Sequence, residues 1–167
     1  YKRFYPAGEV AAHVVGFTNI DGKGQEGIEL ALDTQLQASA GSRKVVKDLK
    51  GNVIRDISQV LAPQPGADIK LSIDMRLQFQ AYKYLKEAMV RYQSKAGSII
   101  LMDAHSGEVL AMANQPSYNP NNRSTVTGQQ LRNRAVTDVF EPGSTMKPFT
   151  VGAALQSGKF DLNSVID

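Results

Sequence analysis

The stretch FEPGSTMKPF, residues Phe140–Phe149, decides how the rest of the chain is interpreted. Its Pro142-Gly143 pair predicts a loop that ends where a helix begins, so that Ser144 lies in the first helical turn. Lys147 follows three residues later and therefore shares a helical face with Ser144. A serine hydroxyl needs a partner that accepts its proton, and a lysine in its neutral form can do this. The stretch predicts a serine nucleophile, Ser144, with a basic neighbour, Lys147.

The spacing alone does not establish that chemistry. With 12 serines and 11 lysines in 167 residues, about 0.8 Ser-x-x-Lys matches are expected by chance, and the chain has one. On spacing alone, a helix-capping serine followed by a solvated lysine is the favoured interpretation. The surrounding chain must decide between the two.

The composition excludes several classes of site and partner. Of the 167 residues 42% are hydrophobic, the net charge is +3 and there is no cysteine. A chain without cysteine has no disulfide scaffold, no thiol nucleophile and no zinc–cysteine site. Basic and acidic residues are interleaved along the chain, so we expect no nucleic-acid partner.

The two ends of the chain suggest a segment of a longer protein. The chain begins at Tyr1 without methionine and stops at Asp167, shortly after a predicted helix. It also contains no run of about 20 apolar residues, the length that a membrane-spanning helix needs. We therefore expect any membrane anchor to belong to the parent chain outside this segment.

The first 66 residues are predicted to form a small module. Its expected elements are a strand, a helix and the two strands of a hairpin, over His13–Phe17, 27–36, Arg43–Asp48 and Val53–Ile57. Glu29 and Asp33 are expected to face water from the helix. Two prolines and a glycine in Ala62–Gly66 can continue neither a helix nor a sheet, which places the domain junction there.

The remaining residues are predicted to form a strand, a long helix, a hairpin and a second helix. The first three occupy Ile69–Ile73, the segment from its cap Asp74 to Tyr92, and Gly97–Met102 with Glu108–Ala113. The long helix is expected to bury the stripe Leu77, Ala81, Leu85, Ala88, Met89 and Tyr92. Gly97–Met102 is almost entirely apolar, which predicts a strand buried on both faces. The helix that follows Ser144 is apolar on almost every side and is expected in a domain interior.

The polar connection and the two histidines complete the predictions from sequence. One helical turn is expected around Gln129–Arg134, inside an otherwise polar connection. His13 and His105 have no acidic or histidine partner pattern around them. Both are interpreted as solvated loop residues and not as ligands.

Several ordered motifs resemble landmarks of class B penicillin-binding proteins. They are Arg3–Gly8, Gly24–Glu29, Leu71–Asp74 with Leu77-Gln78, Gly107–Met112 and Pro116–Asn121. Arg132–Arg134, leading to Phe140–Pro148, resembles the division-specific, septal type most closely. These matches follow one another over essentially the whole chain, which a chance Ser-x-x-Lys does not reproduce.

The resemblance implies an α+β fold with two domains. Residues 1–66 would belong to an N-terminal pedestal module that contacts division proteins, and residues 67–167 to the first part of a transpeptidase domain, with helices on an incomplete antiparallel sheet. It implies a serine D,D-transpeptidase that cross-links peptidoglycan stem peptides on the periplasmic face of the bacterial inner membrane. Ser144 would be the nucleophile, which β-lactams also acylate, and Lys147 its base. Neither metal nor cofactor would take part.

The chain departs from the family pattern after Ser144. The later Ser-x-Asn and Lys-Thr-Gly motifs do not follow, and Ser117–Asn119 and Lys95–Gly97, which match them loosely, come before the serine. A second proton-handling group and half of the oxyanion hole are missing with them. We expect the isolated segment neither to turn over substrate nor to fold stably, because its sheet would have unpaired edges.

Two other functions remain open at this point. One is a β-lactamase or D,D-carboxypeptidase on the same fold. The module that ends near Pro65 argues against a β-lactamase, because β-lactamases lack such a pedestal. The other is a non-catalytic scaffold or a β-lactam-sensing module. Turnover of a stem peptide by the parent protein would separate these alternatives.

Overall fold

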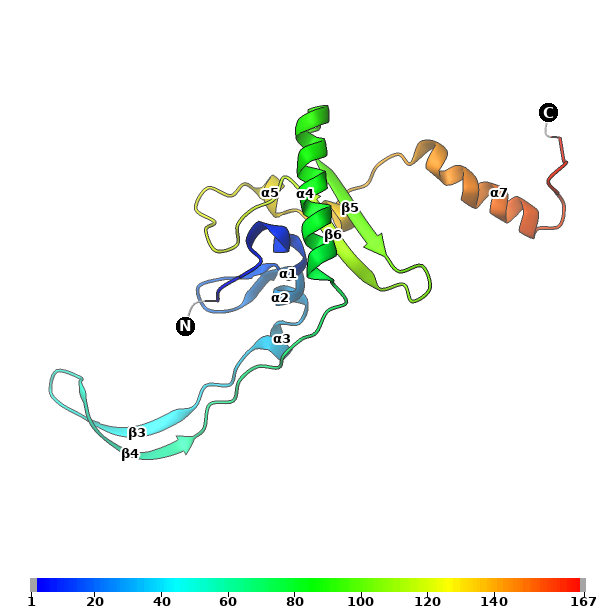
Figure 1. The fold of residues 1–167 in the computed structure, drawn as a ribbon. Helices are drawn as coiled ribbons and strands as arrows, with labels where there is room; N and C mark the ends of the chain where they lie inside the picture. Colours follow the sequence, from blue (N-terminus) through cyan, green and yellow to red (C-terminus); the bar gives the residue numbers. More distant parts are fainter. Residues whose placement is uncertain (1–2, 166–167) are drawn as a thin grey trace. The chain divides into compact units, whose positions relative to one another are not determined.

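The computed structural model describes residues 3–165, and the chain divides into two compact units, residues 1–137 and 138–167 (Figure 1). Helices are combined with antiparallel two-stranded sheets, and the expected α+β class is confirmed. No helix within residues 3–165 is long and apolar enough to span a bilayer.

The core of the first unit lies where helix α4, Met75–Tyr92, packs on the hairpin of strands β5, Gly97–Met102, and β6, Val109–Gln115 (Figure 1). The predicted helix and hairpin are confirmed. The core residues are Ala81, Tyr82, Leu85, Ala111 and Ala113. Leu77 and Tyr92 were predicted in the buried stripe, but they are exposed. The buried stripe is instead Gln78, Ala81, Tyr82 and Leu85, one position away at its start.

Strand β5 is less buried than its sequence predicts. Ile100, Leu101 and Met102 are exposed, so the expectation of a strand buried on both faces is wrong for this chain. Its inner face lies close to α4, because a Cβ added at Gly97 would meet Leu85 Cδ1 at 3.1 Å. Among the described residues β5 pairs with β6 alone. Besides α4 and β6, the short helix α6, Arg134–Thr137, contacts β5, but with four residues it is too short to cover the whole strand.

The N-terminal segment forms short elements where a strand was predicted. They are η1 Gly8–Val10, α1 Ala12–Val15, β1 Phe17–Thr18 and β2 Gly24–Glu26. The predicted strand over His13–Phe17 is wrong, since most of it is helix α1. Burial of Ala12 and His13 outweighs the weak strand propensity of the two valines. Gly16, at φ +77°, then ends the helix and lets the backbone of Glu26 approach closely.

The predicted helix over residues 27–36 is interrupted. It forms as α2, Gly27–Ala31, and α3, Asp33–Leu36, with Leu32 outside helical geometry between them. Glu29 does not face water as expected, because only 6% of it is exposed. Asp33 Oδ1 accepts a hydrogen bond from the backbone N–H of Gly24. Glu29 is buried beside Arg3, and the half-buried Asp33 bonds to β2, which corrects the prediction for both.

The predicted hairpin after residue 40 is confirmed and is longer than expected. It consists of β3, Ser42–Lys47, and β4, Val53–Leu61, paired antiparallel. The strand predicted over Ile69–Ile73 does not form: its burial alternates, but the segment pairs with no strand. Ser72 Oγ donates to Val109 O, and Asp74 N donates to Leu110 O. These single hydrogen bonds connect the segment to β6 in place of regular strand pairing.

The connection after β6 carries two short helices where one turn was predicted. These are α5, Gly128–Leu131, and α6, Arg134–Thr137. A capping box starts α5, because Thr127 and Gln130 bond to each other's backbone N–H groups. Arg132 and Asn133, between the two helices, are non-helical.

The second unit contains a 3-10 turn, η2 Gly143–Met146, followed by helix α7, Lys147–Gln156. The expectation of a buried helix is wrong for this chain, because α7 has no buried residue and Phe149 is 72% exposed. A helix that is apolar on every side needs several partners to cover it. Residues 138–165 form no second long element that could do so.

Candidate active site

Ser144 lies in the η2 turn and Lys147 is the first residue of α7. The turn requires a positive φ at Gly143, +55°, which glycine adopts without strain. Lys147 N donates to Ser144 O, so η2 continues directly into the helix. Because side chains three residues apart align in a 3-10 helix, Ser144 and Lys147 share one side of the turn. Sequence reasoning placed Ser144 in the first α-helical turn, and it lies one turn earlier.

Both side chains of this pair are exposed. Within residues 3–165 neither Ser144 Oγ nor Lys147 Nζ makes a hydrogen bond. Thr145, between them, anchors the turn because its N–H and Oγ1–H both donate to Pro142 O. Pro148 lies in the first turn of α7, where a backbone N–H would have no partner within the helix, so its lack of an N–H costs no hydrogen bond. The turn is thus built locally and presents an accessible hydroxyl beside an amine.

In the first unit, a buried amide network was missed by sequence reasoning. Gln78 is 0% exposed, and its Nε2 donates to Val10 O at 2.7 Å and to Met112 O at 2.9 Å. Its Oε1 accepts from Met112 N at 2.7 Å. The amide therefore pairs with β6 as a neighbouring strand would. Its position four residues after Asp74, on the stripe with Ala81, was the signal that could have identified it.

A second buried amide, Asn114, holds the segment that follows α5. Asn114 Nδ2 donates to Asn133 Oδ1 at 2.9 Å, and Asn114 Oδ1 accepts from Ala135 N at 2.8 Å. Asn133 lies in the Arg132–Arg134 motif, which thereby connects to β6. Its Nδ2 also reaches His13 O at 3.4 Å.

His13 is buried, which corrects its interpretation as a solvated residue. Its Nε2 lies 2.7 Å from Gln130 O. A carbonyl oxygen only accepts, so Nε2 carries the proton. Burial lowers the pKa of His13, while the bond to Gln130 raises it and nearby Arg134 lowers it further. His105, by contrast, is exposed at the β5–β6 turn as predicted.

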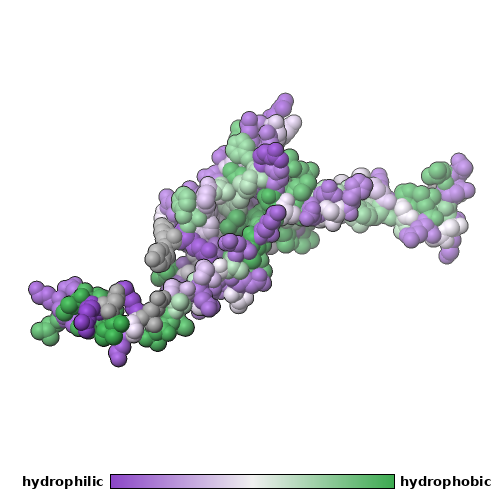
Figure 2. All heavy atoms as spheres, turned by 60° about the horizontal axis from the view of Figure 1, so that its bottom comes forward, coloured by the Kyte–Doolittle hydropathy of each residue, from purple (hydrophilic) through white to green (hydrophobic). Residues whose placement is uncertain are grey.

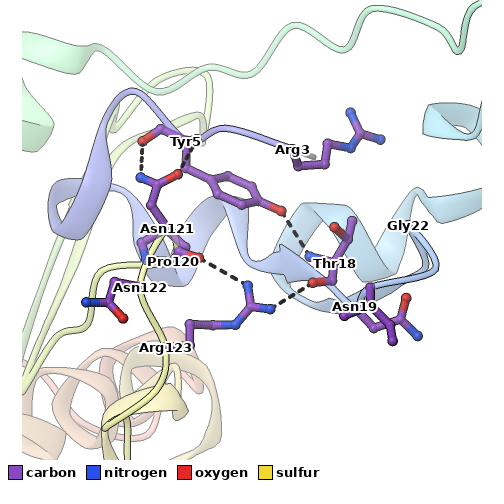
Figure 3. A pocket seen from close by; sticks show the side chains of 10 residues that line it. Arg3, Tyr5, Thr18, Asn19, Gly22, Pro120, Asn121, Asn122 and Arg123 are labelled. Atoms are coloured by element: carbon purple, nitrogen blue, oxygen red, sulfur yellow. Dashed lines mark hydrogen bonds between the residues drawn. The ribbon is translucent and has the colours of Figure 1, made fainter. Parts of the chain in front are cut away.

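Two of the ordered sequence motifs, Arg3–Gly8 and Pro116–Asn121, meet at one cavity of about 460 Å³ (Figure 3). Asn121 bonds to both the N–H and the carbonyl of Tyr5, each at 2.9 Å. Arg123 donates to Pro120 O and Thr18 O and lies 4.0 Å over the Phe17 ring. These bonds fasten residues 3–18 to the loop after β6.

An ion pair between the exposed Arg3 and the buried Glu29 lies beside this cavity. Arg3 contacts Glu29 Oε2 at 3.4 Å and also donates to Leu36 O. Burial raises the pKa of Glu29, and the charge of Arg3 opposes that shift. The arrangement joins the first and second motifs. We see a structural role in it, since no group in the cavity is a nucleophile with a base.

No metal site is found in the part of the chain that the structure describes. Residues 3–165 contain no group of three or more His, Asp or Glu side chains that could hold an ion. Ser144 and Lys147 remain the candidate catalytic pair.

Two models of known protein families match parts of the chain. Residues 1–71 match the family model "Penicillin-binding Protein dimerisation domain", and residues 97–167 match "Penicillin binding protein transpeptidase domain". The chain belongs to the penicillin-binding proteins. Within them it falls in class B, and it is most like the division-specific type.

Individual relatives support the same assignment. The chain is 50% identical over 166 residues to "Peptidoglycan D,D-transpeptidase FtsI" of Escherichia coli K12, covering 99% of this chain and 28% of the relative. It is 49% identical over 166 residues to "Probable peptidoglycan D,D-transpeptidase PbpC" of Pseudomonas aeruginosa, covering 99% and 29%. The chain thus spans less than a third of the length of these relatives.

A solved structure has the same fold over nearly the whole chain. Penicillin binding protein 3 from Mycobacterium tuberculosis superposes with a TM-score of 0.79 at 32% identity. The match covers 98% of this chain and 33% of that one.

Proposed function

We propose that the protein containing this chain is a serine D,D-transpeptidase that cross-links peptidoglycan stem peptides during cell division. The observation that carries the proposal is the Ser144–Lys147 pair on an exposed turn, within the segment that matches the transpeptidase family. We also propose the boundaries 1–66 for the pedestal module and 67–167 for the transpeptidase part. The parent would be anchored at the inner membrane and act on its periplasmic face.

In the proposed reaction Ser144 Oγ attacks the carbonyl carbon of the D-Ala–D-Ala bond. Lys147 Nζ, neutral at that moment, takes the hydroxyl proton and passes it to the leaving nitrogen as the bond breaks. The terminal D-Ala departs, and the stem peptide stays as an ester on Ser144. An amine of a neighbouring stem then attacks the ester, which forms the cross-link and returns the proton to Ser144. The same hydroxyl would attack the carbonyl carbon of a β-lactam and open its ring.

The exposed turn contains only part of the groups that this chemistry needs. A tetrahedral oxyanion requires aligned donors, and removal of one such donor typically costs about 100-fold or more in rate. The proposed activity therefore belongs to the parent protein and not to this chain alone. Division-machinery proteins are proposed to contact its N-terminal module.

The test is acylation of the full-length protein by a fluorescent penicillin, followed by release of D-Ala from a stem peptide. Ser144→Ala should abolish both signals, and Lys147→Ala should slow acylation at least 100-fold because no base remains. Ser94→Ala and Lys95→Ala are matched controls on exposed residues outside this turn, and they should label normally.

The product distinguishes the alternatives. Cross-linked dimers support transpeptidation, whereas hydrolysed stem peptides would indicate a carboxypeptidase. Acylation without any turnover would indicate a β-lactam-sensing module. Labelling that persists in Ser144→Ala would contradict the assignment of the nucleophile.

A further inference from the structure

The β3–β4 hairpin carries the whole net charge of the chain. Residues 42–61 contain five basic and two acidic residues, which equals the chain's total of +3. The basic residues are Arg43, Lys44, Lys47, Lys50 and Arg55. Charges that are balanced elsewhere are thus concentrated on this one element.

One of the hairpin's two acids is occupied inside its turn. Asp48 Oδ1 accepts from the N–H groups of Lys50 at 2.9 Å and Asn52 at 2.8 Å, and its Oδ2 accepts from Asn52 Nδ2 at 3.0 Å. These bonds lower the pKa of Asp48 and keep the tip folded. Lys44 and Lys47 make no ion pair with the side chains that the structure describes, so their charges remain available.

The two edges of the hairpin differ in regularity. The pairing skips one β4 residue at each of three register shifts, namely Ile54, Ile57 and Val60. These bulged residues are 67%, 52% and 69% exposed. Bulges bend and twist a strand, which spoils its outer edge as a template for another strand. Strand β3 contributes no extra residue, so it has the regular edge.

Apolar and charged side chains are interleaved over this hairpin, as Figure 2 shows in the element at its left. Among the described residues β3 has no strand beside it other than β4. Its free backbone N–H and C=O groups can pair with an added strand, and its basic side chains would lie beside the side chains of that strand.

We propose that β3 binds an extended, acidic segment of a partner protein, which adds as a third strand at its free edge. Charge complementarity selects the occupant. A second copy of β3 would bring Lys44 and Lys47 against like charges. A lipid surface could neutralise the lysines, but it cannot pair with the backbone groups of the edge. The proposal extends the partner contacts proposed above and does not involve Ser144.

The test uses the full-length protein and a synthetic ten-residue peptide with glutamate at every third position and valine between, because Lys44 and Lys47, three residues apart, lie on opposite faces of β3. We expect saturable binding by fluorescence anisotropy. Peptide binding should slow amide hydrogen exchange more in residues 42–47 than in residues 53–61. Lys44→Glu with Lys47→Glu should weaken binding about tenfold or more, because two favourable charge pairs become repulsive. Lys23→Glu with Lys95→Glu is the matched control, on exposed lysines outside the hairpin, and should bind normally.

Two further peptides test the strand geometry. An N-methylated version, in which alternate backbone N–H groups are blocked, should lose binding although its charge is unchanged. A lysine–valine peptide should not bind. Acylation of Ser144 by penicillin should be the same in the Lys44→Glu/Lys47→Glu protein, so failure of this proposal is distinguishable from failure of the proposed reaction.

Three results would overturn the proposal. The first is equal binding by the charge-reversed hairpin. The second is protection of residues 42–47 by vesicles of phosphatidylglycerol and phosphatidylethanolamine in the absence of peptide. The third is concentration-dependent protection of the same residues by the protein alone, which would identify a second copy as the occupant.

Discussion

Gln78 satisfies three backbone groups of two other segments with one side-chain amide. Gln78→Leu keeps the approximate volume but leaves the carbonyls of Val10 and Met112 and the N–H of Met112 without partners. Each buried unsatisfied group costs about 1–3 kcal/mol, so we expect a loss of roughly 3 kcal/mol or more in unfolding free energy. Amide hydrogen exchange of β6 in the full-length protein measures the loss directly.

Gln80→Leu is the matched control for that experiment. Gln80 lies on the same helix but is exposed, so its replacement should leave the exchange of β6 unchanged. If the two variants exchange alike, the buried amide is not an important contact between α4 and β6.

His13 predicts a pH dependence of stability. Burial lowers its pKa below the ordinary 6.5, so the unfolded chain binds the proton more readily than the folded one. The contribution of His13 is therefore complete above about pH 6.5 and is lost as the pH falls through the lower folded value. Thermal melting of the full-length protein between pH 7.5 and 5 should show this decline, and His13→Gln should reduce it.

His105→Gln, at an exposed turn, should leave the pH profile unchanged. A profile that is identical in wild type and His13→Gln would show that other groups cause the decline.

The sequence could not reveal the burial of His13, because its partner Gln130 is 117 positions away. Glu29 was missed for the same reason, since its burial depends on how Arg3 and residues 24–33 fold together.

Helix α4 offers a test of its predicted N-cap. Asp74 accepts from the N–H groups of Arg76 and Leu77, and its bonds with Arg76 lower the pKa of its carboxyl to about 2. Asp74→Ala should speed hydrogen exchange in the first turn of α4 and lower the melting temperature, whereas Asp74→Asn retains a capping oxygen and should have a smaller effect. Equal losses in the two variants would point to the ion pair with Arg76 and not to the cap. Because this carboxyl is acidified by folding, its contribution should persist to about pH 4 and disappear as the pH falls toward 2.

Elements with strong local signals could be predicted from sequence, and elements shaped by distant contacts could not. Helix α4 has a cap, an apolar stripe and good helix formers, and the two long hairpins have alternating residues around turn signals. Helix α1 has only four residues, two of them β-branched, so only packing of Ala12 and His13 decides its conformation. The Ser144 turn was predicted because Pro142 and Pro148 restrict the backbone locally and Gly143 permits the positive φ that the turn needs.

Burial was predicted less well than secondary structure, and the reason lies at the scale of the whole molecule. Apolar composition indicates that a surface is to be covered, but it does not say by which part of the protein. The outer face of β5 and the sides of α7 are both apolar and both exposed here, with the exposed residues Ile100, Leu101, Met102, Phe149 and Val151. The chain also spans less than a third of the length of the two curated relatives named above.

These exposed surfaces give the last prediction, for the 167-residue chain expressed by itself. Its open β5 edge and uncovered helix should make it bind a hydrophobic dye and aggregate with rising concentration. It should not be acylated measurably by a fluorescent penicillin, because Ser144 and Lys147 lack further donors around them. The full-length protein, assayed in parallel, should label at Ser144 and bind little dye. Robust labelling of Ser144 in the short chain would contradict the prediction and would mean that the turn and its lysine suffice for acylation. Ser144→Ala in both proteins separates specific from adventitious labelling.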